Sequence, residues 1–453
     1  MKSQMATTAL FFLMVSPALG QQERPTMTLE EVVQVARQRN PAFRRAEIGT
    51  RSAEANVLAA YGSFLPSLSA NLGWNGSRTK TSFGTDDFGG TIIESQSRTI
   101  RNSNANQGLS TSLTLFDGFA NVNTLRAARM GVEAQHNAVA IEELSLVANV
   151  STAFYRAVVQ QQQIDVEEQL LEARREDLQR EERLFTIGSS DQVKLLTVQL
   201  QVAQQEQSLA EAINEARRRR LVVLQQLGIL GEVTDFEPSG VLPEVFDPTL
   251  IDPADLVRVA MAQHPSIGQV DAQSTQRERE LARARGERLP RITANGSFGR
   301  GTGSDGYGSF FDFNPSAQQR FSFGLQVSLP IFDRFSMSQS AAIASVALDQ
   351  AQEDVWERRV EREQLVRSAL INLESAYTTL QLQTRRLELN RQRLELAQEQ
   401  YRFNAVTFIE LQQYINDVAT AERDIVNRQL DFATALVSLE QQVGQAIPRP
   451  EAQ

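Results

Sequence analysis

The chain has 453 residues, of which 22% are charged, and a formal net charge of −10 at pH 7. This acidic balance argues against nucleic acid as a partner. The sequence holds no cysteine and two histidines, so it can build neither a disulfide framework nor a thiolate or histidine-cluster metal site. We therefore expect no metal site and no cofactor.

The first 20 residues have the pattern of a secretory signal peptide. Lys2 precedes an apolar run from residue 9 to residue 15, and the small-residue sequence Ala18-Leu19-Gly20 marks a cleavage site. No later apolar run approaches the roughly 20 residues that a transmembrane helix requires. If the mature chain enters a membrane, we expect it to do so as β-strands.

The rest of the chain contains an internal repeat. Residues 28–74 match residues 252–298 at a constant offset of 224, and further matches continue at an offset of 216. The matched pairs include Pro41 and Pro265, Gly62 and Gly286, Pro66 and Pro290, Asp117 and Asp333, and Gly228 and Gly444. A repeat of this length is too large for a solenoid unit, so each copy should form half of one architecture. We place the first structural repeat at residues 21–248 and the second at residues 249–453.

Each repeat contains two segments in which apolar and polar residues alternate strictly. These segments are residues 67–74, 109–115, 292–298 and 321–329, close to the length of a strand that crosses a bilayer in a barrel. A half-buried hairpin of a soluble protein would show the same alternation. The signal peptide favours the membrane, as do the Gly-, Ser- and Asn-rich segments 75–108 and 299–320, which we interpret as long exterior loops.

Long helices follow the second strand of each repeat. Residues 119–185 and 335–403 are rich in Ala, Leu, Glu, Gln and Arg, and no proline occurs from residue 67 to 237 or from 331 to 447. Each segment could form one helix of about 100 Å, far longer than a globular domain needs. Apolar residues at three- and four-residue spacing, such as Val147, Val150 and Phe154, predict a stripe that packs on neighbouring helices.

Both long helices are predicted to reverse through matching turns. Gly188 and Asn404 are of the residue types that tolerate the left-handed conformation that ends a helix. Capping boxes that start at Ser189 and at Thr407 are predicted to begin the returning helices, which end at Gly228 and Gly444.

Four membrane strands cannot close a barrel, because about eight is the smallest number that fills its own interior. An open sheet edge in lipid would also leave backbone groups without hydrogen bonds. A dimer would supply eight strands around a packed core, and a trimer twelve strands around an aqueous lumen. The polar inner faces, rich in Ser, Thr and Asn, favour the trimer.

The order of these features resembles the TolC family of outer-membrane efflux proteins. The residues that carry the resemblance are Leu-Phe-Asp-Gly at 115–118, Ile-Phe-Asp-Arg at 331–334, and the turn sequences at 185–188 and 403–405. The resemblance implies a homotrimer with a 12-stranded barrel in outer-membrane lipid and a helical barrel that extends into the periplasm. It also implies a passive exit duct for small molecules or proteins, in a tripartite efflux or type I secretion system with a periplasmic adaptor (membrane fusion) protein and an inner-membrane pump.

The resemblance also implies candidate site residues. The residues of the two periplasmic tips, where an adaptor would dock, are Ile187, Gly188, Ser189, Phe403, Asn404, Ala405 and Val406. The acidic ring that gates the periplasmic end in the family corresponds best to Glu410, and Asp191 is a further acidic candidate. A structural role is as strong an interpretation of each carboxylate as a gating role. Glu410 can complete a capping box, and Asp191 can stabilise a helix N-terminus.

Two other classes of protein are alternatives to a channel. A secreted enzyme would need a cluster of acid, base or nucleophile side chains, and the abundant Asp and Glu residues form no identifiable catalytic site. A secreted or surface coiled-coil protein with a structural or adhesive role would explain the helices without the paired, alternating strands. We therefore predict no enzymatic activity and keep the coiled-coil protein as the alternative.

Overall fold

The computed structural model of the protein describes residues 26–86, 92–229, 236–305, 318–403 and 405–447. The predicted signal peptide and Asn404 lie outside the described residues. Within the described part of the chain, none of the helices contains a stretch that is both long enough and apolar enough to span a membrane.

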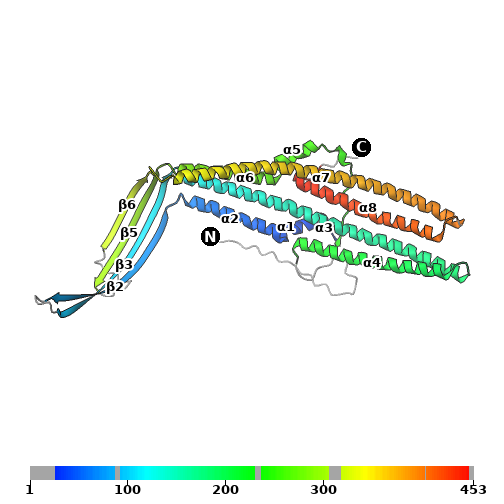
Figure 1. The fold of residues 1–453 in the computed structure, drawn as a ribbon, viewed down its shortest axis with the longest axis horizontal. Coiled ribbons are helices and arrows are strands. Elements are labelled where there is room, and N and C mark those ends of the chain that lie inside the picture. Colours follow the sequence, from blue (N-terminus) through cyan, green and yellow to red (C-terminus); the bar gives the residue numbers. More distant parts are fainter. Residues whose placement is uncertain (1–25, 87–91, 230–235, 306–317, 404, 448–453) are drawn as a thin grey trace, which may run out of the picture. The chain divides into compact units, whose positions relative to one another are not determined.

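The two repeats fold into the same series of elements with the same helix lengths (Figure 1). In each repeat a helix of 11 residues and one of 22 precede two strands, and helices of 67 and 36 residues follow them. The first repeat contains α1 (Leu29–Arg39), α2 (Pro41–Gly62), β2 (Ser67–Asp86), β3 (Ile92–Asp117), α3 (Ala120–Thr186) and α4 (Gln192–Leu227). The second contains α5 (Pro253–Gln263), α6 (Pro265–Gly286), β5 (Arg291–Asp305), β6 (Gln318–Ser328), α7 (Ser336–Arg402) and α8 (Phe408–Val443). The short strands β1 (Thr26–Met27) and β4 (Glu237–Pro238) pair in parallel, and a 3₁₀ turn covers Pro248–Leu250.

The chain divides in space into two compact units that do not coincide with the repeats. Unit 1 includes the described residues of 1–40, 146–246 and 376–437, and unit 2 those of 41–145, 247–375 and 438–453. Each unit therefore draws on both repeats, because α3, α7 and α8 contribute residues to both units. The repeat boundaries at residues 248 and 249 remain a prediction.

Unit 2 contains one antiparallel sheet of four strands in the order β2-β3-β5-β6. The predicted strands are confirmed, and their register aligns side chains of one kind across the sheet. Ser69, Ser110, Ser297 and Ser322 are successive partners in one such row. Since alternate residues of a strand face opposite sides, the sheet has one face rich in hydroxyls and amides and one rich in apolar side chains.

The predicted exterior loops were too long. Residues 75–86 and 92–108 belong to β2 and β3, which pair from Ser67 with Ser112 to Asp86 with Ile92. In the second repeat, residues 299–305 and 318–320 are also strand, and residues 306–317 lie outside the described residues. Glycine, serine and asparagine have low strand propensity, but cross-strand hydrogen bonds from a partner outweigh that local preference.

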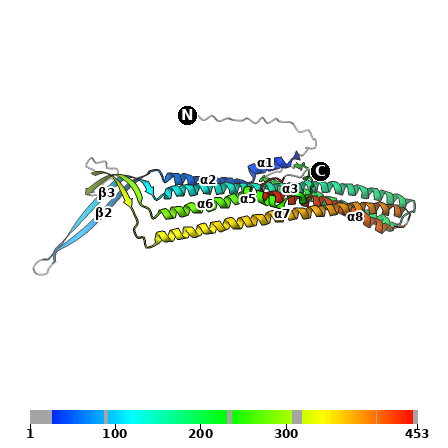
Figure 2. The ribbon, with the colours of Figure 1, turned by 90° about the horizontal axis from the view of Figure 1, so that it is seen from above.

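Below the sheet, the adjoining parts of α2, α3, α6 and α7 lie side by side in unit 2 (Figures 1 and 2). The strand-to-helix junction at Gly118 is closely packed against the end of α6. Gly118 has φ +68°, and a Cβ there would lie 2.1 Å from the Gly286 carbonyl oxygen. The junction therefore needs glycine for its backbone conformation and for its close backbone contact.

His264 is a structural residue at the start of α6. Its Nδ1 accepts a hydrogen bond from the Ser266 backbone N–H at 3.1 Å, and its Nε2 donates to the Gln441 carbonyl oxygen at 3.3 Å. Burial is the main cause that lowers the pKa of His264 to about 4, and the nearby positive charge of Arg362 is the second. Asn40 occupies the matching place in the first repeat and donates to the Gln226 carbonyl oxygen. The histidine thus ties α6 to the end of α8 in its neutral form.

Unit 1 has an aromatic and aliphatic core. Phe432 is fully buried and makes an edge-to-face contact with Phe246 at 5.7 Å, and Phe154 is also almost fully buried. The returning helix α4 ends at Gly228 with φ +66°, as predicted, where the Gly228 and Ile229 N–H groups bond back to Gln225 and Leu224. In unit 2, Gly444 ends α8 with φ +89°.

Candidate functional site

The turn between α3 and α4 forms the first predicted tip. Gly188 has φ +73°, its N–H bonds to the Phe185 carbonyl, and the Ser189 N–H bonds to the Leu184 carbonyl at 2.8 Å. This pair of hydrogen bonds is the Schellman arrangement that ends a helix on a left-handed glycine. Ile187 remains 72% exposed. The tip therefore presents an apolar side chain on a rigidly defined turn.

The predicted capping box at Ser189 is wrong. The N-cap of α4 is Asp191, whose Oδ1 accepts from the Lys194 backbone N–H at 2.8 Å. The Ser190 hydroxyl instead bonds to the buried Glu181 carboxylate on α3. A box at Ser189 would have satisfied the N–H of Gln192, but α4 begins later, and the cap at Asp191 satisfies the N–H of Lys194 instead.

The turn between α7 and α8 forms the second predicted tip, at the same end of unit 1 as the first (Figures 1 and 2). The Ala405 N–H bonds to the Gln400 carbonyl at 3.0 Å, and Phe403 is 83% exposed. Ala405 is exposed and Val406 half-buried. Each tip thus carries at least one large, mostly exposed apolar residue beside its turn.

The predicted capping box at the start of α8 is confirmed. The Glu410 carboxylate accepts from the Thr407 backbone N–H and hydroxyl, both at 2.8 Å, and the Glu410 N–H bonds back to the Thr407 hydroxyl. The backbone hydrogen bond from Thr407, together with that from its hydroxyl, lowers the pKa of Glu410. Glu410 and Asp191 are both exposed caps. The structural interpretation of each carboxylate therefore holds, and the exposed charge remains for a further role.

A polar stripe on α3 is a feature that the sequence analysis missed. Gln160, Glu167, Arg174 and Glu181 recur at seven-residue spacing, and all four are buried. This spacing keeps them on one face of the helix, inside unit 1. The seven-residue spacing of these polar residues is present in the sequence, but the apolar residues of the same helix had indicated only an ordinary apolar core.

The polar stripe joins α3 to both returning helices. Glu167 bonds to Arg423 of α8 at 2.5 and 2.8 Å and accepts from Gln205 of α4 at 2.6 Å. Seven residues further along α3, Arg174 donates to Gln412 at 2.7 Å and to Asn416 at 2.6 Å, both on α8. Burial lowers the pKa of Arg174. Such a buried network fixes the register of the helices, because every polar group requires its partner.

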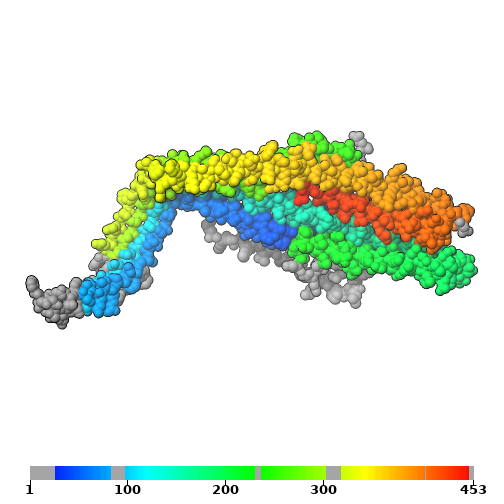
Figure 3. Space-filling view, viewed as in Figure 1, coloured from blue at the N-terminus to red at the C-terminus, as the bar shows by residue number. Residues whose placement is uncertain are grey.

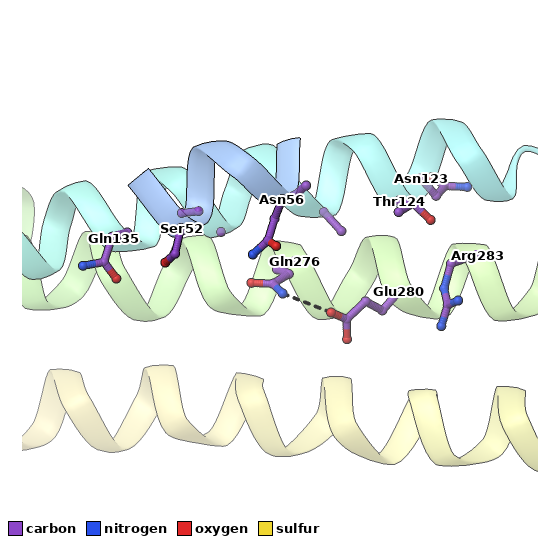
Figure 4. Close-up of a pocket in the computed structure, with 12 residues that line it drawn as sticks. Ser52, Asn56, Asn123, Thr124, Gln135, Gln276, Glu280 and Arg283 are labelled. Carbon is purple, nitrogen blue, oxygen red and sulfur yellow. Dashed lines mark hydrogen bonds between the residues drawn. The ribbon is translucent and has the colours of Figure 1, made fainter. Parts of the chain in front are cut away.

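A polar groove lies in unit 2 between α2, α3 and α6 (Figure 4). Its volume is about 490 Å³, and Figure 4 shows amide and hydroxyl side chains from the three helices along it. The only carboxylate of the lining residues, Glu280, accepts from Gln276 at 3.0 Å. The lining residues include no histidine and no second carboxylate, so the groove offers no acid–base pair. Among the described residues, no group of three or more His, Asp or Glu side chains could hold a metal ion.

A comparison with family models gives a match in each repeat. The model described as outer membrane efflux protein matches residues 32–228 and 256–445, which together form most of the chain. The chain belongs to the outer membrane efflux protein family. No curated protein sequence matches it.

Solved structures described as transmembrane or outer membrane channels share the fold. CusC matches with a TM-score of 0.73 and 18% identity, over 92% of each chain. The outer membrane channel CmeC of Campylobacter jejuni matches with 0.71 and 17%, over 92% of this chain and 85% of that one. The open state of the MtrE outer membrane channel of Neisseria gonorrhoeae matches with 0.68 and 18%, over 94% and 91%.

Family membership identifies the protein as an efflux channel component of the outer membrane, extending into the periplasm. The predicted family, fold class and localisation are therefore confirmed. The family is one of efflux proteins and not of enzymes. The alternative of a coiled-coil adhesin loses its support, since it accounts for neither the family match nor the four-stranded sheet.

Proposed function

We propose that three copies of this outer membrane efflux protein close their sheets into a 12-stranded barrel, which continues as a helical tube. The observation that carries the proposal is the open sheet, with β2 and β6 as its edge strands. An edge strand exposes backbone N–H and C=O groups, and these groups cannot remain unpaired in lipid. Pairing β6 of one copy with β2 of the next satisfies both edges and returns to the start after three copies.

The two faces of the sheet fit a barrel in a membrane. Apolar side chains such as Leu68, Phe323 and Leu325 are 65–84% exposed on one face. Figure 3 shows the strands as open surface, uncovered by any described helix on the side in view. The opposite face carries the serine row, in which Ser69 bonds to Ser110 and Ser297 to Ser322. An oily outer face and a hydroxyl-lined inner face are those of a water-filled duct.

The tips support docking of a periplasmic adaptor protein that links this duct to an inner-membrane pump. The proposed docking residues are Ile187, Gly188, Ser189, Phe403, Asn404, Ala405 and Val406. A defined turn with one exposed apolar anchor is the kind of surface that a protein partner recognises with little loss of conformational entropy. Small molecules or proteins would pass through the duct, and the pump would select them.

Asp191 and Glu410 are the proposed gate residues. Threefold symmetry brings three copies of a side chain near the axis wherever the helices converge. Three carboxylates in a small space attract cations, so the closed duct would prefer cations and bind multivalent ones. The lowered pKa of Glu410 keeps its charge in place throughout the neutral pH range.

Native mass spectrometry of the detergent-purified protein, followed by single-channel recording in planar bilayers, tests the assembly. We expect a trimer that conducts ions and whose conductance falls on addition of trivalent cations. A stable monomer, or a trimer without conductance, would contradict the proposed barrel.

A further inference from the structure

The apolar face of the sheet ends at a defined height on β2 and β3. On β2 the residues of this face include Leu68, Leu72 and Trp74, and Trp74 pairs with Ala105 of β3. From Leu115 to Ala105, β3 would rise about 25 Å at the usual strand spacing and tilt of a barrel. This is the height of the apolar band of an outer-membrane barrel, so Trp74 lies where its upper edge is expected.

Basic residues follow directly beyond that edge, on the same face. Arg78 and Lys80 are four and six residues after Trp74, so alternation keeps them on its side of the sheet. Arg101 of β3 lies directly opposite Arg78, and Thr99 lies opposite Lys80. We call Arg78, Lys80 and Arg101 the basic rim. All three are exposed.

This arrangement is unfavourable in the isolated sheet. Two like charges directly opposite each other on neighbouring strands repel and destabilise the pair. An anion bound between them would reverse that cost. Guanidinium groups present planar donors that match phosphate oxygens, and a headgroup phosphate lies at the boundary where the rim begins.

We propose that the basic rim binds the phosphate groups of lipid headgroups in the outer leaflet, on the outside of the barrel. The inference rests on the proposed barrel, which sets the outward face and the exterior end of the hairpin. Three copies would give a belt of three phosphate sites around the duct, each above the aromatic edge at Trp74. Arg300 lies on the same face and pairs with Gln107, two residues nearer the membrane centre than the Trp74–Ala105 pair. It already has side-chain contacts of its own.

Two double variants separate the rim from the rest of the sheet. The rim variant is Arg78→Gln with Arg101→Gln. The matched control is Arg98→Gln with Arg320→Gln, because Arg98, paired with Thr81, and Arg320 are also exposed but lie on the opposite, lumen face. Both variants remove two arginines from the same sheet and leave the strand register unchanged.

Purified trimers are titrated with diphosphorylated lipid A, and with zwitterionic phosphatidylcholine in parallel, and bound lipid is counted by native mass spectrometry. Each basic residue near anionic headgroups contributes about fivefold to binding, so we expect the rim variant to bind lipid A roughly 25-fold more weakly. The control should stay within about twofold of the parent protein, and phosphatidylcholine binding should be the same for all three.

Equal lipid A binding by the rim variant and the parent would overturn the inference, as would an equal loss in the control. Oligomeric state and conductance are measured on the same samples. A parent protein that is not a conducting trimer refutes the proposed barrel. Conducting trimers that bind lipid A equally refute the basic rim alone.

Discussion

The buried ion pair between Glu167 and Arg423 offers a quantitative test of the polar stripe. Glu167 is 7% exposed and receives two hydrogen bonds from Arg423 and one from Gln205. Arg423→Ala removes two of these three bonds and leaves a buried carboxylate without its cation. We expect this substitution to loosen the contact of α8 with α3.

The size of the effect follows from burial. Removing one partner of a fully buried ion pair costs about 3–5 kcal/mol. The Arg423 side chain is 34% exposed, so water can reach the site and the cost falls to about 2 kcal/mol. Arg391 pairs with Glu422 at 2.8 Å, but that arginine is 61% exposed, and its loss should cost at most about 0.5 kcal/mol. Arg391→Ala is therefore the matched control.

Hydrogen exchange measured by mass spectrometry on the purified protein reads out local opening of α8. A cost of about 2 kcal/mol corresponds to roughly 30-fold faster exchange around residue 423, against about twofold in the control. Adding Glu167→Gln to Arg423→Ala removes the stranded charge and keeps an acceptor for Gln205, so exchange should slow again. Similar exchange in Arg423→Ala and Arg391→Ala, or no recovery in the double variant, would refute the reasoning.

The other predictions concern single residues. Gly118→Ala should sharply reduce the yield of folded trimer, because its Cβ would lie 2.1 Å from a backbone oxygen, whereas Gly62→Ala meets nothing within 4 Å and should be tolerated. Gly188→Pro should distort the tip, because proline cannot adopt φ +73°; we expect assembly to survive and efflux, measured as drug resistance, to fail. Full resistance would show that this turn is not needed for adaptor docking. As pH falls from 6.5 to 4, His264 is protonated in the unfolded chain before it is protonated in the folded one, so up to about 3 kcal/mol of folding stability is lost. In thermal unfolding measured over this pH range, His264→Asn should lack this loss of stability. Glu410→Gln keeps the capping box but removes the charge, so it should weaken trivalent-cation block in planar bilayers at unchanged stability; unchanged block would leave capping as its only role.

Most of the helical architecture was predictable, because its causes are local. Helix propensity without proline defined α3 and α7 to within one residue of the predicted ends. The turn at Gly188 followed from the one residue type that adopts a left-handed conformation without strain. The candidate tip and gate residues came from the family resemblance, and they remain proposals.

Other features depended on the folded geometry and on partners elsewhere in the chain. The strand hairpin of β2 and β3 extends well past its alternating part because each residue finds a cross-strand partner, which composition does not reveal. The N-cap of α4 moved from Ser189 to Asp191 because the geometry of the turn decides which side chain can reach the free N–H groups.

The sequence by itself determined the repeat, the order of the elements, the length of the long helices α3 and α7, and the alternation that predicts a barrel strand. These properties arise from periodicity and from interactions between near neighbours. Only the tertiary structure decided that Glu167 meets Arg423, 256 positions later, and that Gly118 meets Gly286. The free energy of burying a charge or of bringing two backbones together depends on what the rest of the chain places beside them, and no local pattern encodes that neighbour.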